Sequence, residues 1–197
     1  MELMYFTRAE ASPMTEPNDA DAIILAVRRW VETVVVGLNL CPFAGRELRE
    51  ERVRFVVTPA TNEAQLLASL KTELERLDTH PAVETTLLIH PRVLQNFADY
   101  NQFLETSDEL LGAMDLGGIY QIASFHPHYQ FADAALDNVE NYTNRSPYPM
   151  LHLLREQSLE RSIAGYPDTK QIPLRNIAMM RRLGIARLRQ LSRDCFT

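Results

Sequence analysis

The feature that most constrains the fold is an alternation of short apolar runs with longer amphipathic segments between residues 20 and 125. The short runs are rich in β-branched and apolar residues, as buried strands are, and span residues 52–57, 83–89 and 119–125. Apolar residues at steps of three and four predict helices over residues 23–38, 61–77 and 94–111. Such alternation favours crossover connections. We therefore predict an α/β fold with a small, mainly parallel sheet of three or four strands covered by helices.

The rest of the chain comprises a leader, a long loop and two further helical regions. Residues 126–149 show no periodicity, and irregular stretches of this length inside a domain are often functional. A helix is predicted from Met150 to Ala164, stopped by Gly165, and a last helical region begins near Pro173. Residues 1–18 resemble a flexible leader. The 197 residues thus divide into this leader and a single α/β domain over residues 19–197.

Composition narrows the class of protein. The only cysteines, Cys41 and Cys195, cannot form a disulfide framework, and no apolar stretch has the features of a secretory signal or a membrane span. These observations favour a cytoplasmic protein with no membrane partner. From residue 170 onward the chain has seven basic residues and one acidic residue, but no interleaved aromatics, which argues against nucleic acid. No nucleotide cofactor motif is present.

Two His-Pro steps follow predicted strands. His90 ends the second strand and His126 ends the third. Because the carboxyl ends of parallel strands meet at one edge of a sheet, both imidazoles are expected there, where ligands of α/β proteins bind. A histidine can also simply hydrogen-bond the loop backbone. With two equivalent steps we favour the functional alternative, in which His126 and His90 act as acid or base.

The long loop and the predicted helix after it contain the candidate substrate-binding residues. Arginine matches a carboxylate or phosphate, and asparagine, serine and histidine can hydrogen-bond the same ligand. The predicted helix would place His152, Arg155 and Glu156 on one face. In the alternative, Arg155 only pairs with a carboxylate and so fixes the loop. The predicted substrate-binding set is Arg145, Arg155, Asn141, Asn144, His152 and Ser124.

Cys41 is the third candidate for a catalytic role. A short helix is predicted to start at Cys41 and Pro42, and a thiol at a helix N-terminus is more reactive. With a histidine nearby it could act as a nucleophile. A buried, inert thiol is the alternative. A divalent metal is also considered, held by His90, His126 and His128 with Cys41 or Asp133, although no established metal motif is present.

Three functions follow from these residues. The favoured one is a cytosolic enzyme that acts on a small anionic metabolite at a His/Arg/Cys site on the carboxyl edge of the sheet. The second is a metal-binding protein or metal-dependent enzyme that uses the three histidines named above. The third is a non-catalytic protein that meets a partner through the long loop or the basic C-terminal helix.

Four segments carry a family resemblance. They are VETVVVGLNLCPFAGREL, TLLIHP, IYQIASFHPHYQFA and ENYTNRSPYPMLHLLRE. These segments are similar to the bacterial domain-of-unknown-function family numbered 1415, and the similarity runs from about Ala20 to Gly184. The resemblance implies one cytosolic domain and brings no activity, cofactor or catalytic residue with it.

Overall fold

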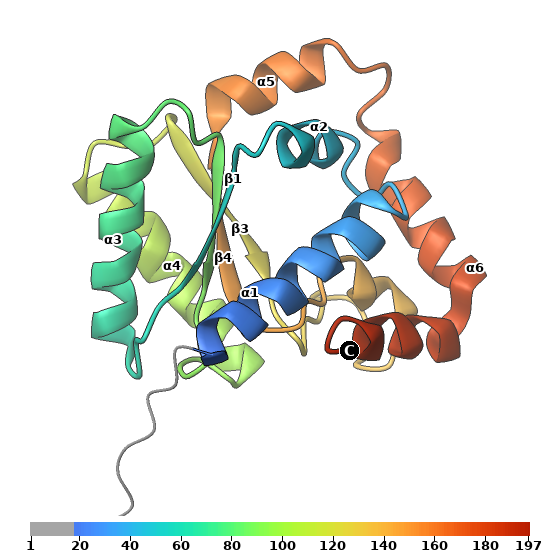
Figure 1. Cartoon of the computed structure of the whole chain (residues 1–197). Coiled ribbons are helices and arrows are strands. Elements are labelled where there is room, and N and C mark those ends of the chain that lie inside the picture. The colour runs from blue at the N-terminus through green and yellow to red at the C-terminus, as the bar shows by residue number, and fades with distance from the viewer. Residues whose placement is uncertain (1–17) are drawn as a thin grey trace, which may run out of the picture.

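The computed structural model describes residues 18–197, so the predicted leader lies almost entirely outside the described residues. These residues form a single sheet with helices on both faces (Figure 1). Among them no helix combines the length and the apolar character needed to cross a membrane.

The sheet contains four strands in the order β1-β2-β4-β3. They are β1 (Val53–Val57), β2 (Thr85–Ile89), β3 (Tyr120–Phe125) and β4 (Met150–Arg155). β1 pairs with β2 in parallel, whereas β4 lies between β2 and β3 and is antiparallel to both. The predicted α/β class with a small sheet is confirmed. One pairing is parallel and two are antiparallel, yet β1, β2 and β3 still run in the same direction.

β4 is the main difference from the sequence prediction, which placed a helix from Met150 onward. That helix is wrong over its first six residues, because helix α5 begins only at Glu156 and spans Glu156–Ala164. Leu151 and Leu154 stand three apart, which fits a helix as well as a strand. Strand pairing on both sides decides the outcome, since β4 buries Met150, Leu151 and Leu153 between two neighbours.

Two helices cover one face of the sheet. They are α3 (Glu63–Thr79) and α4 (Phe97–Ala113), which begin at the side-chain caps Asn62 and Asn96. Leucines of α3 and aromatic residues of α4 pack against Leu88, Leu151 and Leu153 of the sheet. The predicted helices over residues 61–77 and 94–111 are confirmed.

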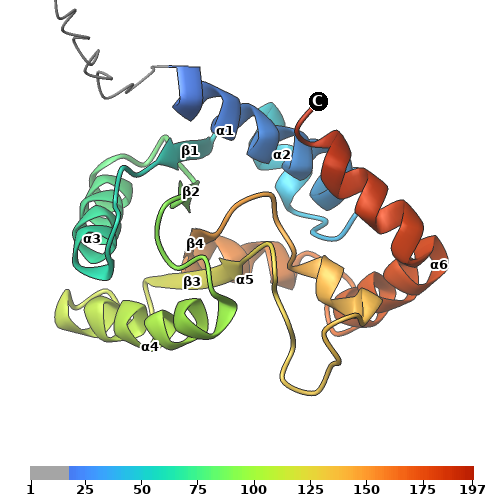
Figure 2. The ribbon, with the colours of Figure 1, turned by 90° about the horizontal axis from the view of Figure 1, so that it is seen from below.

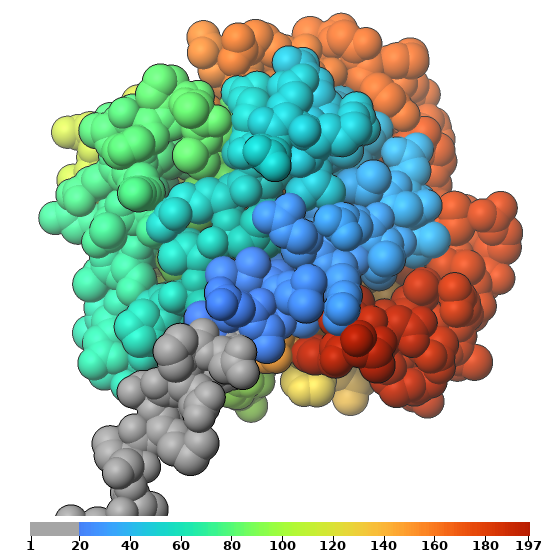
Figure 3. Space-filling model, in the orientation of Figure 1, coloured from blue at the N-terminus to red at the C-terminus, as the bar shows by residue number. Residues whose placement is uncertain are grey.

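The other face is covered by the two ends of the described chain, α1 (Asn18–Trp30) and α6 (Gln171–Asp194) (Figure 2). A π-helical stretch, η1 (Val31–Val36), continues α1 and ends at Gly37, as the sequence predicts for the end of this helix. Gly184 kinks α6 with a φ of 70°, a backbone angle that favours glycine. The short helix α2 (Ala44–Arg49) follows η1, and α1 and α2 form much of this surface (Figure 3).

Residues 126–149 form the predicted long loop, whose only helical turn is the 3₁₀ segment η2 (Val139–Thr143). η2 lies against α6, and Arg181 of α6 forms an ion pair with Glu140 of η2. The loop therefore docks on the C-terminal helix, on the side of the molecule opposite α3 (Figure 2).

Candidate functional site

The two histidines that follow strands lie at the carboxyl ends of β2 and β3. His90 and His126 are fully buried, and Tyr100 of α4 stands between them. The centroid of the Tyr100 ring lies 5.7 Å from that of His90 and 5.1 Å from that of His126. The Tyr100 hydroxyl donates a hydrogen bond to the Met150 carbonyl and accepts one from the Phe125 amide. The cluster therefore links α4 to the ends of β3 and β4.

The imidazole of His126 is bonded to backbone at both nitrogens. Its Nδ1 accepts from the His128 amide at 3.0 Å, and its Nε2 donates to the Leu94 carbonyl at 3.1 Å. His90 donates through Nδ1 to the Val93 carbonyl at 3.0 Å, and its buried Nε2 has no partner in the described chain. Burial lowers the pKa of His90 and of His126 to about 4, so both rings are neutral at physiological pH.

The metal alternative depends on the same histidines. Within residues 18–197, no group of three or more His, Cys, Asp or Glu side chains is arranged to hold a metal ion. His128 is exposed, and its ring centroid lies 5.8 Å from that of His126, whose nitrogens already have backbone partners. Asp133 is exposed in the loop, and Cys41 lines a separate pocket.

The polar side chains of the loop form hydrogen bonds with the backbone of the loop and of the neighbouring strand. The buried Asn141 side chain accepts from the Phe131 amide and donates to the Ala135 carbonyl. Asn144 donates to the backbone carbonyl of Ser124. Arg145 donates to the carbonyls of Tyr129 and Leu136 and stacks on Tyr142. Their hydrogen bonds thus fix loop shape and attach the loop to β3.

Arg155 is a tether, but it bonds backbone carbonyls outside the long loop rather than the carboxylate that the alternative prediction gave it. From the end of β4 it donates hydrogen bonds to the carbonyls of Leu77 and Val83 and to the Tyr120 hydroxyl. Leu77 lies in the last turn of α3, Val83 lies between α3 and β2, and Tyr120 begins β3. One guanidinium thereby satisfies the last carbonyls of a helix and fixes the turn that enters the second strand.

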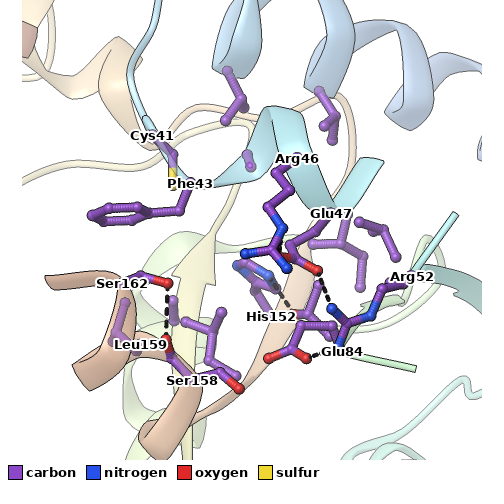
Figure 4. A pocket seen from close by; sticks show the side chains of 18 of the residues that line it. Cys41, Phe43, Arg46, Glu47, Arg52, Glu84, His152, Ser158, Leu159 and Ser162 are labelled. Carbon is purple, nitrogen blue, oxygen red and sulfur yellow. Dashed lines mark hydrogen bonds and ion pairs between the residues drawn. The ribbon is translucent and has the colours of Figure 1, made fainter. Parts of the chain in front are cut away.

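A pocket of about 540 Å³ opens on the α1-side face of the sheet, between the sheet, η1, α2 and α5 (Figure 4). It begins where β1 and β2 begin, at the end of the sheet away from His90. Its apolar lining comes from Trp30, Val31, Val35, Cys41, Phe43, Ala44, Val53, Leu87, Ala123, Phe125, Leu154 and Leu159. Its polar lining comes from Arg46, Glu47, Arg52, Glu84, Thr85, His152, Arg155, Ser158, Arg161 and Ser162.

A chain of charged groups forms one wall of the pocket (Figure 4). Arg52 pairs with Glu47 at 3.1 Å and also with Glu84, and Arg46 pairs with Glu50 at 3.1 Å. Arg161 bonds only the Gln157 carbonyl and the Ser158 hydroxyl, so it has no carboxylate partner within residues 18–197. The lining contains four arginines and two glutamates. Because Arg46 also pairs with Glu50, just outside the lining, the local excess is a single positive charge.

His152 lies in the middle of the pocket (Figure 4). It stands on β4 between Leu87 of β2 and Ala123 of β3. Its Nε2 lies 2.8 Å from the Thr85 hydroxyl. Burial lowers the pKa of His152 to about 4, so a neutral imidazole faces the cavity at physiological pH.

Cys41 lies half-buried at the apolar end of the pocket, two residues before Phe43. The predicted helix start, with Cys41 as the N-cap residue, is wrong by two residues, because α2 begins at Ala44 with Phe43 as its N-cap residue. Cys41 instead sits in the bend between η1 and α2. Its thiol therefore lacks the helix N-terminus that the sequence suggested would activate it.

The structure brings only part of the predicted site together. Cys41, His152 and Arg155 line the pocket, whereas His90, His126, Arg145, Asn141, Asn144 and Ser124 lie outside its lining. Sequence reasoning missed the charged wall and the groups of α5. A signal for the wall was present: Arg52 and Glu84 stand at the start of two predicted strands, and the starts of neighbouring parallel strands meet.

The fold and the pocket define an α/β protein with a mainly apolar ligand-sized cavity on one face of a mixed sheet. The chain belongs to the family described as "Protein of unknown function (DUF1415)", which matches residues 22–190. No curated protein and no solved structure matches the chain.

Proposed function

We propose that this chain binds a small amphiphilic anion in the pocket between the sheet, η1, α2 and α5. The observation that carries the proposal is the lining of that pocket, which joins an apolar body to an arginine-rich wall around a neutral imidazole. Its volume of about 540 Å³ is within the range of roughly 300–1,000 Å³ that small-molecule sites occupy. The anionic metabolite expected from the sequence is thus assigned to this pocket.

The apolar part of the ligand is expected at the end formed by Trp30, Phe43 and Phe125. These rings come from three different elements, and Trp30 contacts Phe125 edge to face at 5.1 Å between centroids. Burying an acyl chain or aromatic ring there removes apolar surface from water, which contributes about 25 cal/mol per Å².

The anionic end of the ligand is expected near Arg161 of α5. The other arginines of the lining already have partners, because Arg46 and Arg52 pair with carboxylates and the guanidinium of Arg155 is bonded to carbonyls. Arg161 is exposed at the rim and carries its charge without a carboxylate partner in the described chain. A carboxylate or sulfonate bound there would gain a charge-assisted hydrogen bond.

The test is a fluorescence titration with anilinonaphthalene sulfonate, a probe with an apolar body and one anionic group. We expect saturable binding that decanoate competes away and that decylamine does not. Ala123→Phe fills the floor of the pocket and should abolish saturable binding, whereas Ala98→Phe, on the exposed surface of α4, should leave it intact. Equal binding by both variants would contradict the proposal.

A second pair of variants tests the charge. Arg161→Gln should weaken binding of the sulfonate about tenfold, the equivalent of about 1.4 kcal/mol. Arg189→Gln removes the same charge from α6 outside the pocket and should change the affinity by less than about twofold. The melting temperature of each variant shows that the fold is kept.

A further inference from the structure

His152 differs from the other buried histidines because one edge of its ring is open. The ring lines the pocket from β4, with the side chains of Leu87 and Ala123 on the neighbouring strands. Its Nε2 points to Thr85 on β2. Its position on the central antiparallel strand fixes the ring direction, since strand neighbours hold it on both sides.

The Thr85 hydroxyl decides which nitrogen of His152 bears the hydrogen. That hydroxyl has a single hydrogen, and it lies 2.5 Å from the Leu153 carbonyl, which can only accept. The Thr85 hydrogen is therefore used on Leu153, and the Thr85 oxygen is left to accept from His152 Nε2 at 2.8 Å. In the neutral ring the hydrogen must then be on Nε2, which leaves a lone pair on Nδ1.

Nδ1 of His152 has no hydrogen-bond partner in the described chain. Unlike His90 Nε2, it is not among the buried atoms without a partner, so it keeps accessible surface, and the cavity that the ring lines is where this surface opens. By contrast, His126 Nδ1 is occupied by the His128 amide. The pocket thus presents one unoccupied acceptor on a mainly apolar floor.

We infer that the molecule in this pocket donates a hydrogen bond to His152 Nδ1, so that the site takes an amphiphilic anion that also carries a hydroxyl or N–H group. This inference rests on the proposed function and specifies its ligand class. A ligand with an ether or carbonyl oxygen at that position places two acceptors against each other. Sites built to bond a hydroxyl discriminate strongly against the analogue that lacks it.

The first measurement needs no ligand. In protein labelled with ¹⁵N-histidine, the two ring nitrogens of His152 should show the shifts of a protonated Nε2 and an unprotonated Nδ1 at neutral pH. The resonances are assigned by their loss in His152→Gln. Thr85→Val keeps the shape of residue 85 without its hydroxyl, and should give a mixture of tautomers. A protonated Nδ1 in the native protein overturns the inference.

The second measurement compares ligands in pairs. Positional isomers of hydroxynaphthoate, each against its methyl ether, compete with anilinonaphthalene sulfonate for the native protein. At least one hydroxynaphthoate should bind about tenfold more tightly than its ether. This ratio should fall toward one in Thr85→Val and should be unchanged in His80→Gln, which removes an exposed histidine outside the pocket.

The outcomes separate the two proposals. If every ether binds as well as its hydroxyl counterpart while the sulfonate still binds in the pocket, the donor requirement is overturned and the proposed function stands. If neither the sulfonate nor any naphthoate binds, the proposed function fails, and the ligand class inferred from it fails too.

Discussion

Two histidines, one at the carboxyl end of the sheet and one in the middle of β4, show how the same residue type serves different roles. At the carboxyl end, His126 has backbone partners on both ring nitrogens and is fully buried against Tyr100. In the middle of β4, His152 has one side-chain partner and one open nitrogen in a cavity. Both rings are neutral, and burial is the cause in both cases. The two histidines therefore differ in whether one ring nitrogen is left without a hydrogen-bond partner, and not in their pKa. That open nitrogen distinguishes a binding group from a structural one.

The largest expected effect is the loss of stability when the structural histidine, His126, is replaced. His126→Ala should lower the free energy of unfolding by about 4 kcal/mol, because it leaves a cavity and removes the partners of buried backbone groups. His152→Ala should cost only about 1 kcal/mol, since the ring is half-buried and bonds one hydroxyl. Urea denaturation of both variants measures the difference, and equal losses would refute the contrast.

Arg155 and Arg161 are expected to differ in the same way, one stabilising the fold and the other binding the ligand. Arg155→Met should cost about 3 kcal/mol of stability, because several carbonyls lose a charged donor. Arg161→Met should stay within about 0.5 kcal/mol of the native protein, as exposed substitutions usually do. Urea denaturation at neutral pH gives both values. If Arg161→Met is the more destabilised protein, the assignment of tether and binding arginine is reversed.

As the pH falls, His126 and His152 are expected to lower the stability of the protein by similar amounts. The pKa of each histidine is about 4 in the folded chain and about 6.5 when unfolded, so the unfolded state binds protons first as the pH falls. The stability that these two neutral rings contribute is fully present above pH 6.5 and decreases as the pH falls toward 4. Each ring should account for about 2 kcal/mol lost by pH 5.

The contribution of one ring is read from variants that cannot titrate. The stability lost between pH 7.5 and pH 5 should be about 2 kcal/mol smaller in His126→Gln than in the native protein, and similarly smaller in His152→Gln. His80→Gln, at an exposed histidine, is the matched control and should lose as much as the native protein. A full loss in His126→Gln would show that its ring is not neutral in the folded state.

The sequence predicts most of the fold because its patterns are local. The spacing of Leu66, Leu70 and Leu74 identifies α3 without knowledge of its neighbours, and the run before His90 identifies β2. β4 escaped prediction because its pattern fits both a helix and a strand, and only its insertion between β2 and β3 decides. Since β4 forms the pocket floor, the location of the pocket could not be predicted either.

The candidate site could be predicted only in part for the same reason. His152 was selected from the sequence as part of a helical face, but it lines the pocket because it stands on a strand. Arg155 was selected with it, although the alternation of a strand turns the two side chains to opposite faces of the sheet. Residues of α2, α5 and the sheet line the pocket together, and the meeting of segments that are distant in sequence, such as α2 and α5, leaves no periodic signal.

The smallest expected effect extends the comparison to the two thiols. Cys195 is 2% exposed, its thiol donates to the Leu191 carbonyl at 3.2 Å, and burial raises its pKa. Cys41 is half-buried at the wall of the pocket. Ellman's reagent should therefore modify Cys41 about tenfold faster than Cys195, because the thiolate must be accessible to react. The fast phase should vanish in Cys41→Ser and slow when anilinonaphthalene sulfonate is bound. A fast phase that survives in Cys41→Ser would place the accessible thiol in the C-terminal helix region, and a fast phase that the sulfonate leaves unchanged would separate Cys41 from the bound molecule.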